Sequence, residues 1–209
     1  IDSVKRELDL MAEGFATSLS TTQGISNSSF GRAEFAGIIT SVFGYDQAFV
    51  VGVEGQLMLR SDLAADERYA WIKPLLMPML DRAISPARRS KEEHPDSVVE
   101  LMRLQGRPSI VGVVPIVRKA ADPLYLIAYR YIDGAALDAF SRQQGLNGAR
   151  FARASDPESN EVSFQIDATA GNEPIGFVIW TPDLPGSRVV GLLDPALAGA
   201  ALMTATLFA

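Results

Sequence analysis

Three tyrosines and an arginine lie within one β-prone run of the sequence, residues 124–132. A strand points alternate side chains to opposite faces, so Tyr125, Tyr129 and Tyr131 share one face. Arg130 lies on the other face. Three tyrosines on one face offer stacking surface and hydroxyl groups, a combination that lines small-molecule pockets. Packing beneath a helix as ordinary core is the alternative for them.

Arg130 and Trp180 complete the predicted ligand-binding residues. A buried arginine needs a carboxylate partner, which for Arg130 is Asp133, another acid of the chain or an anionic ligand. Trp180 lies near the end of a predicted strand, shortly before Pro182. Its alternative role is to pack at the edge of the sheet.

Catalytic motifs are missing from the sequence. It contains no glycine-rich phosphate loop and no Gly-x-Ser-x-Gly elbow. His94 is the single histidine, it lies in a charged loop with Glu92, Glu93 and Asp96, and the chain has no cysteine. A tight transition-metal site normally needs more than one histidine or cysteine ligand. The sequence therefore predicts no catalytic residue, no metal site and no cofactor.

Composition limits the class of partner. The formal net charge of the 209 residues is −6, and Lys and Arg form no clustered excess. A surface that binds phosphates needs such a cluster, so nucleic acid is not an expected partner. Hydrophobic residues make up 47% and charged residues 21%, which is typical of a chain that folds.

The first twenty residues have the spacing of an amphipathic helix. Apolar residues recur at steps of three and four: Ile1, Val4, Leu8, Met11, Phe15 and Leu19. The spacing fits a helix that faces the core and also a stalk or dimer helix. Residues 1–22 are predicted as an N-terminal stalk helix, and residues 23–187 as the domain that follows it.

The rest of the chain alternates between short strands and helices. Strands are expected at 48–53 and 56–61, around the turn Glu54-Gly55, and at 109–117 and 124–132. Helices are expected at 32–43, at 66–83 with breaks near Pro74 and Pro78, at 97–104, and from Asp133 to about residue 144. A short strand at 150–153 and a hairpin of 162–168 with 175–181 follow. This order predicts an α+β fold, a PAS-like and mainly antiparallel sheet flanked by helices, with long N-terminal and C-terminal helices.

The C-terminal segment is apolar. Between Val189 and Ala209 the only charged residue is Asp194. Because a bilayer-spanning helix needs about 20 mostly apolar residues, residues 188–209 are predicted as the start of a transmembrane helix. A buried, alanine-rich terminal helix is the alternative.

Several short motifs, in this order, resemble one family. They are Phe43-Gly44-Tyr45-Asp46 leading into 48–53, Gly106-Arg107-Pro108, Val114-Pro115-Ile116, the run 129–134, and the stretch 175–186 with Trp180-Thr181-Pro182. The chain from about residue 43 to 209 thereby resembles the fourth class of CHASE-type extracytoplasmic sensor domains. The Trp-Asp-Asp motif that this family commonly carries after its first helix has no counterpart in residues 20–45.

The resemblance implies a function. Such domains lie between two membrane helices, face the periplasm from the bacterial inner membrane, and precede cytoplasmic GGDEF and EAL domains or a histidine kinase. We therefore expect a non-enzymatic sensory domain that binds a small ligand, signals through a transmembrane helix to cyclic di-GMP synthesis or breakdown, and forms a homodimer. A ligand-free dimerisation or spacer module is the first alternative. A small membrane-anchored hydrolase that uses His94 is the second.

Overall fold

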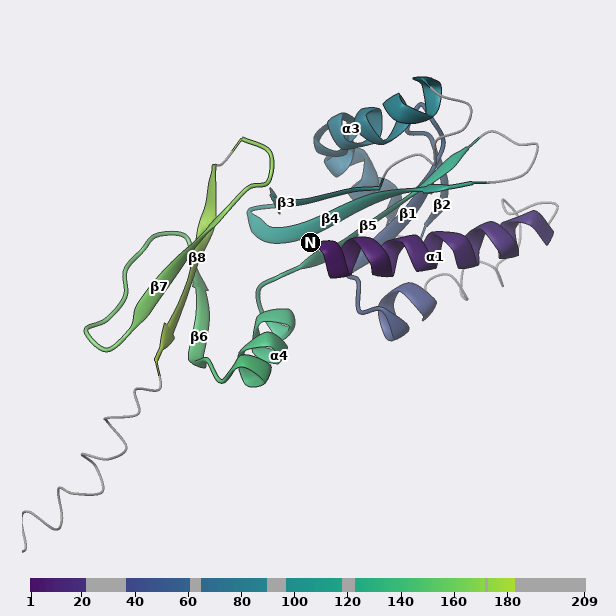
Figure 1. Cartoon of the computed structure of the whole chain (residues 1–209). Helices are drawn as coiled ribbons and strands as arrows, with labels where there is room; N and C mark the ends of the chain where they lie inside the picture. The colour runs from purple at the N-terminus through teal and green to yellow at the C-terminus, as the bar shows by residue number, and fades with distance from the viewer. Residues whose placement is uncertain (22–36, 61–64, 90–96, 118–122, 172, 183–209) are drawn as a thin grey trace, which may run out of the picture. The chain divides into compact units, whose positions relative to one another are not determined.

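The computed structural model describes residues 1–21, 37–60, 65–89, 97–117, 123–171 and 173–182 (Figure 1). The chain divides into two compact units. The first contains residues 1–134 and 166–175, and the second contains residues 135–165 and the chain from 176 onward.

The first unit is built around a five-stranded sheet. Its helical elements are α1 (Asp2–Thr21), the single π-helical turn η1 (Ile38–Val42) and α3 (Ala65–Arg89). Its strands are β1 (Gln47–Val51), β2 (Leu57–Arg60), β3 (Val98–Leu104), β4 (Arg107–Ile116) and β5 (Leu124–Tyr131). They lie in the order β2-β1-β5-β4-β3, and each neighbouring pair is antiparallel. The predicted fold class, a mainly antiparallel sheet flanked by helices, is confirmed.

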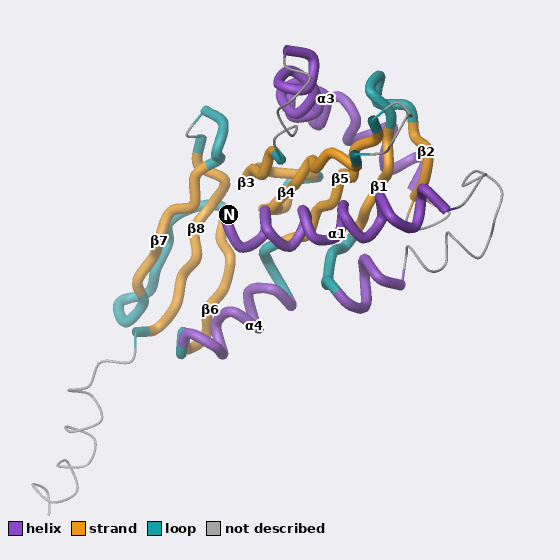
Figure 2. The backbone as a smooth tube through the Cα atoms, turned by 45° about the vertical axis from the view of Figure 1, so that its right-hand side comes forward, coloured by secondary structure: helices purple, strands orange, loops and turns teal. Residues whose placement is uncertain are grey.

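The two faces of this sheet are covered by different helices, as Figures 1 and 2 show. On one face, residues of α1 pack with Val50, Leu126 and Ala128. On the other face, residues of α3 pack with Phe49 and the tyrosines of β5. The side-chain alternation expected for 124–132 is therefore present, and β5 is buried on both sides.

Helix α1 approaches the sheet closely over β4. Its apolar positions Val4, Leu8, Met11 and Phe15 are buried. A Cβ atom added at Gly112 of β4 would lie 2.0 Å from Cδ1 of Leu8, so any larger residue there would force the Leu8 side chain or the helix to shift. The further role of residues 1–22 as a stalk stays a prediction.

Helix α3 corrects one expectation, because it continues through Pro74 and Pro78 without a break. A proline inside a helix removes one backbone hydrogen bond and leaves a carbonyl unpaired. Both prolines lie on the exposed side of α3, where water reaches the backbone. The buried side, with Ile72, Leu76, Met79 and Leu80 among its residues, holds the helix on the sheet.

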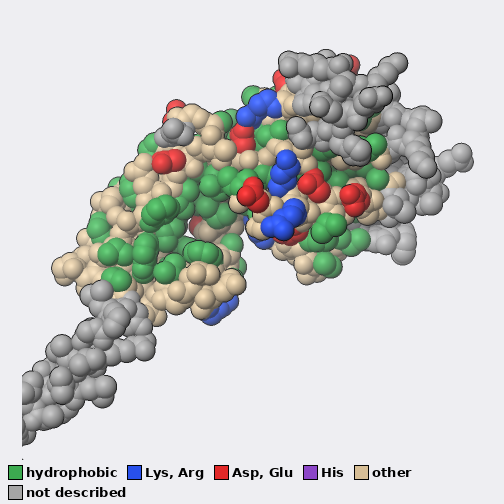
Figure 3. Space-filling model, viewed as in Figure 1, with side chains coloured by type: hydrophobic (Ala, Val, Ile, Leu, Met, Phe, Trp, Pro, Cys, Tyr) green, Lys and Arg blue, Asp and Glu red, His purple; other side chains and the backbone are tan. Residues whose placement is uncertain are grey.

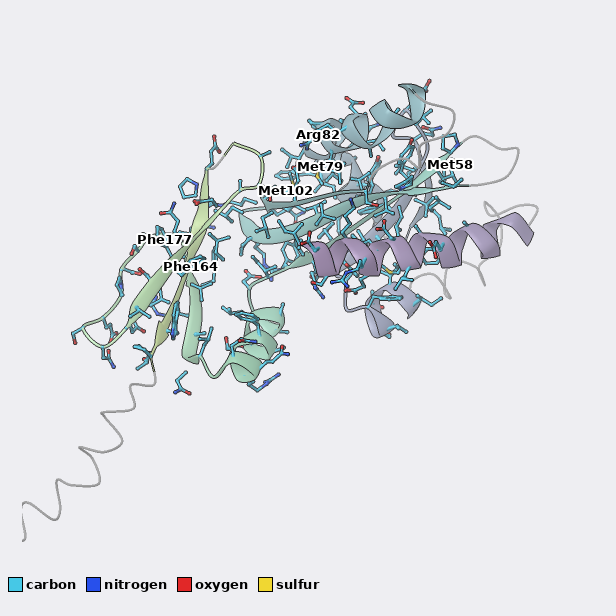
Figure 4. All side chains as sticks on the ribbon, in the orientation of Figure 1. Met58, Met79, Arg82, Met102, Phe164 and Phe177 are labelled. Carbon is cyan, nitrogen blue, oxygen red and sulfur yellow. The ribbon has the colours of Figure 1, made fainter. Side chains whose placement is uncertain are left out.

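The second correction concerns residues 97–104, where a helix is predicted and Val98–Leu104 form strand β3. All seven residues of β3 pair with β4, from Val98 opposite Val113 to Leu104 opposite Arg107. Glu100 of β3 is buried and forms an ion pair with Arg82 of α3, the residue that Figure 4 labels. The sequence pattern of this segment fits either state, and pairing with β4 decides it.

The tip of a hairpin, residues 166–175, belongs to the first unit and is bonded to β3. The amide of Thr169 donates to the carbonyl of Leu101 at 3.0 Å, and the amide of Leu101 donates to Oγ1 of Thr169 at 2.9 Å. A guanidinium N–H of Arg103 donates to the carbonyl of Ile175. Strand β3 therefore has bonded partners on both edges.

The second unit contains one helix and most of a three-stranded sheet. Its elements are α4 (Ala135–Gln144), β6 (Asn147–Ala152), β7 (Val162–Asp167) and β8 (Pro174–Thr181), with the strands in the order β6-β8-β7. The hairpin of β7 and β8 and the stop of α4 at Gly145, whose φ is +68°, are as predicted. Hydrophobic side chains gather over this sheet in Figure 3, and Figure 4 labels Phe164 and Phe177 among them.

Candidate functional site

The tyrosines of β5 differ in how far they reach solvent. Tyr125 is 0% exposed and Tyr129 is 1% exposed, whereas Tyr131 at the strand end is half-buried. The ring centroids of Tyr129 and Tyr131 lie 5.6 Å apart in an edge-on arrangement, and that of Phe49 lies 6.4 Å from Tyr129. Tyr125 and Tyr129 thus form part of the core beneath α3. Tyr131, on the same face of the strand, reaches the surface. The binding of a ligand by these residues stays a prediction.

Burial also changes the acidity of tyrosines on this face. The hydroxyl of Tyr69 in α3 donates to the carbonyl of Gly55 at 2.8 Å, and burial raises the pKa of Tyr69 to about 12. Burial, and then the neighbouring Tyr131, raise the pKa of Tyr129 well above its usual range. At neutral pH both phenols are protonated, so they act as hydrogen-bond donors and stacking surfaces and not as bases.

A polar cluster surrounds the exposed end of Tyr131. The guanidinium carbon of Arg107 lies 3.7 Å from the centroid of the Tyr131 ring. Arg107 also donates to both carboxylate oxygens of Asp133, at 2.6 and 3.1 Å, and this hydrogen bonding raises the pKa of Arg107. Asp46 accepts from the backbone amide of Tyr131 at 2.8 Å. The Tyr131 ring therefore stacks on Arg107, which Asp133 holds in place, while Asp46 binds the backbone of Tyr131.

The turn between β3 and β4 carries the next polar side chain. Leu104 pairs with Arg107, so Gln105 and Gly106 form a two-residue turn, and their φ angles are +53° and +77°. Positive φ at both positions is typical of a type I′ hairpin, and glutamine adopts it seldom. Oε1 of Gln105 accepts from the Tyr131 hydroxyl at 3.0 Å. This bond fixes the side chain of the turn against the tyrosine face.

An open groove of about 660 Å³ lies beside this turn. It is lined by Glu67, Arg68, Trp71 and Leu75 of α3 and by Arg103, Gln105 and Gly106 of the β3–β4 hairpin. Trp71 is 71% exposed. The groove meets the tyrosine face through Gln105, the partner of Tyr131.

The sequence did not point to these groove residues. Residues 97–104 were expected to be helical, and the helix at 66–83 was expected to break at its prolines. Because the sequence predicts a helix at 97–104 and a broken helix at 66–83, it does not place Trp71 and Arg103 on one surface. A two-residue Gln-Gly turn between two β-prone runs was the signal that indicates the hairpin.

Arg130 lies on the opposite face of the sheet from the tyrosines. Its guanidinium carbon lies 5.4 Å from the centroid of the Tyr45 ring. Asp133, which the sequence offered as a partner of Arg130, forms its two-point pair with Arg107. Burial raises the pKa of Tyr45, whose hydroxyl is buried without a hydrogen-bond partner among the described residues.

Trp180, the fifth predicted ligand-binding residue, is half-buried on β8 in the second unit. The other four belong to the first unit. A role for Trp180 in ligand binding stays a prediction.

Two further expectations concern metals and membranes. Within the described residues, no three histidine, cysteine, aspartate or glutamate side chains are grouped so that they could hold a metal ion. His94 lies outside the described residues, as does the apolar segment 188–209. None of the helices that the structure describes is both long enough and apolar enough to cross a membrane.

Comparison with known protein families gives one match. Residues 19–152, more than half of the chain, match the sequence profile of the family described as the CHASE4 domain. The matched segment contains η1, α3, α4 and all five strands of the first sheet. No curated protein matches the chain.

Proposed function

The chain belongs to the CHASE4 domain family, a family of extracytoplasmic sensory domains, and on this premise we propose that it binds a small ligand in the periplasm as the input domain of a membrane-bound signalling protein. Family membership indicates a sensory role and not a catalytic one. The ligand, the membrane helix and the output are our proposal.

The open groove at the β3–β4 turn is the observation that supports ligand binding. A volume of about 660 Å³ falls within the range that holds small molecules. The groove joins an aromatic face, through Gln105 and Tyr131, to the exposed end of α3. Groups that stack, donate hydrogen bonds and carry charge thus meet at one place.

We propose that the signal leaves through the apolar segment 188–209, as the start of a transmembrane helix in the bacterial inner membrane. The chain acts there as a homodimer, and its output is the synthesis or breakdown of cyclic di-GMP by cytoplasmic GGDEF and EAL domains. Binding drives such an output only where the ligand has different affinities for two conformations of the dimer.

A thermal-shift screen of the purified chain against small metabolites tests this function. A ligand that binds only the folded state and is present at 100 times its Kd stabilises that state by about 2.7 kcal/mol. The expected result is a concentration-dependent rise in Tm with at least one metabolite. A chain that is dimeric but whose Tm responds to no metabolite would instead be a spacer or dimerisation module.

A further inference from the structure

The apolar wall of the groove is formed by two residues of α3 that face solvent. Trp71 is 71% exposed and Leu75, one turn later, is 47% exposed. Residues four apart lie on the same side of a helix, so the indole and the leucine form one continuous apolar surface. Both residues line the groove. The apolar part of any occupant therefore lies against α3.

The charged residues of the groove indicate the charge of the ligand that it binds. Arg68 of α3 and Arg103 of β3 line it, against a single carboxylate, that of Glu67. A guanidinium presents parallel N–H groups that match the two oxygens of a carboxylate. Two arginines against one acid favour an anion, because a guanidinium has five N–H donors and retains some of them when it also binds a group of the protein.

Gln105, at the rim of the groove, is held in place by contacts within the protein. Gln105 occupies the left-handed region of backbone conformation, and its side chain accepts from Tyr131. A side chain held in this way loses little conformational freedom on binding. Strained backbone positions of this kind cluster at binding sites.

Arg103 also connects the groove to strand β8. One of its N–H groups donates to the carbonyl of Ile175, the second residue of β8. A guanidinium has five N–H donors, so Arg103 retains donors for an anion while it is bonded to Ile175. Strand β8 leads on to residue 182 and the C-terminal segment.

We propose that the groove between α3 and the β3–β4 turn binds a small organic carboxylate with a flat apolar body. The body stacks on Trp71, and the carboxylate pairs with Arg68 and Arg103. Arg103 thereby links the ligand to the first residues of β8. The role of this site in signalling rests on the proposed sensory function, but its binding is measured independently of any output.

The chain has two tryptophans, Trp71 and Trp180, so a Trp180→Phe variant makes Trp71 the only fluorescent indole. Phenylacetate is the probe, because it is an apolar ring with one carboxylate. Phenylacetamide is the matched control, since it has nearly the same shape and no charge. The expected result is a saturable change in Trp71 emission with phenylacetate at a Kd of about 1 mM or tighter, and a response at least about tenfold weaker with phenylacetamide.

Three charge-removing variants in the same background complete the test. Arg68→Gln and Arg103→Gln are each expected to weaken phenylacetate binding by about tenfold. Arg6→Gln removes the same charge from an exposed position on α1, over the opposite face of the sheet, and leaves binding unchanged. Circular dichroism and Tm confirm that each variant is folded.

Any of these results in the emission titrations would overturn the groove assignment: no saturable change in emission, equal responses to the acid and the amide, or arginine variants that bind like Arg6→Gln. If phenylacetate does not bind while a metabolite stabilises the parent, Arg68→Gln and Arg103→Gln equally, the groove assignment fails and the sensory function stands. Phenylacetate binding that depends on both arginines supports the groove, whatever the output domain of the full-length protein does.

Discussion

The guanidinium of Arg107 stacks on the ring of Tyr131, with its carbon 3.7 Å from the ring centroid. The two residues lie on adjacent antiparallel strands, near the ends of β4 and β5. The same guanidinium donates to Asp133 just beyond β5. Arg107 therefore ties the end of β5 to the hairpin that carries the groove.

Arg107→Lys tests the geometry of this contact. Lysine keeps the charge but loses both the planar stacking surface and the two-point bond to Asp133. We expect a loss of about 1 kcal/mol in the free energy of unfolding, measured by urea denaturation. Arg6→Lys on α1 is the matched control and changes stability by less than about 0.5 kcal/mol. Equal effects of the two substitutions would show that the stacking on Tyr131 contributes nothing.

Tyr45 and Tyr69 form a natural pair for a second prediction. The buried hydroxyl of Tyr45 has no hydrogen-bond partner among the described residues, whereas that of Tyr69 donates to Gly55 at 2.8 Å. Tyr45→Phe is expected to be neutral or to stabilise the fold by about 1 kcal/mol, because it removes an unsatisfied polar group. Tyr69→Phe is expected to destabilise by about 1 kcal/mol. Urea denaturation of both variants checks this, and a Tyr45→Phe loss as large as that of Tyr69→Phe would contradict it.

Alkaline pH is expected to unfold the chain through its buried phenols. The folded state raises the pKa of Tyr45, Tyr69 and Tyr129 above the ordinary value of 10.0, chiefly by burial. Their contribution to stability is complete below pH 10 and is lost as the pH rises through their folded pKa values, because the unfolded chain ionises first. Each such tyrosine adds a slope of about 1.4 kcal/mol per pH unit in that window.

The measurement is the free energy of unfolding between pH 8 and 11, together with the absorbance of ionised tyrosine. Tyr69→Phe removes one of the three groups and should flatten the alkaline slope. A slope in this variant equal to that of the parent would contradict the assignment.

The close approach of α1 to β4 gives a fourth prediction. Gly112→Ala places a methyl group against Leu8 and is expected to cost about 1–3 kcal/mol. Leu8→Ala alone is expected to cost about 2–5 kcal/mol, since Leu8 is fully buried. In the double variant the added methyl occupies part of the vacated space, so the combined loss is smaller than the sum by about 0.5–3 kcal/mol.

Gly14→Ala is the control for this series. Gly14 lies on the exposed side of α1, and an added Cβ there meets no atom within 4 Å. The same substitution is expected to stabilise the helix by about 0.5–1 kcal/mol. Additive losses for Gly112→Ala and Leu8→Ala would show that the two residues do not press on each other.

The sequence predicts those parts of the fold that depend on a pattern among a few adjacent residues. The alternation in β5 separates the tyrosines from Arg130 without any knowledge of the sheet. The turn at Glu54-Gly55 and the stop at Gly145 depend on backbone conformations that glycine adopts easily. These elements were predicted because each depends on a few adjacent residues.

The groove did not follow from the sequence, because its walls depend on packing between distant segments. Pro74 and Pro78 weaken a helix in isolation, and only the buried side of α3 explains why it continues. Residues 98–104 become a strand through β4, which also brings Arg103 to the groove that Trp71 lines. Asp133 pairs with Arg107 and not with its close neighbour Arg130, because the β4–β5 pairing places the end of β5 beside the start of β4.

The double burial of β5 has a mechanical consequence. Consecutive residues of this strand, such as Ile127 and Ala128, contact the layers of α3 and α1 respectively. The side-chain layers beneath the two helices thus share strand β5. We therefore expect a displacement of α3 that bends or twists β5 to alter the packing beneath α1 as well, with no loop between the two layers.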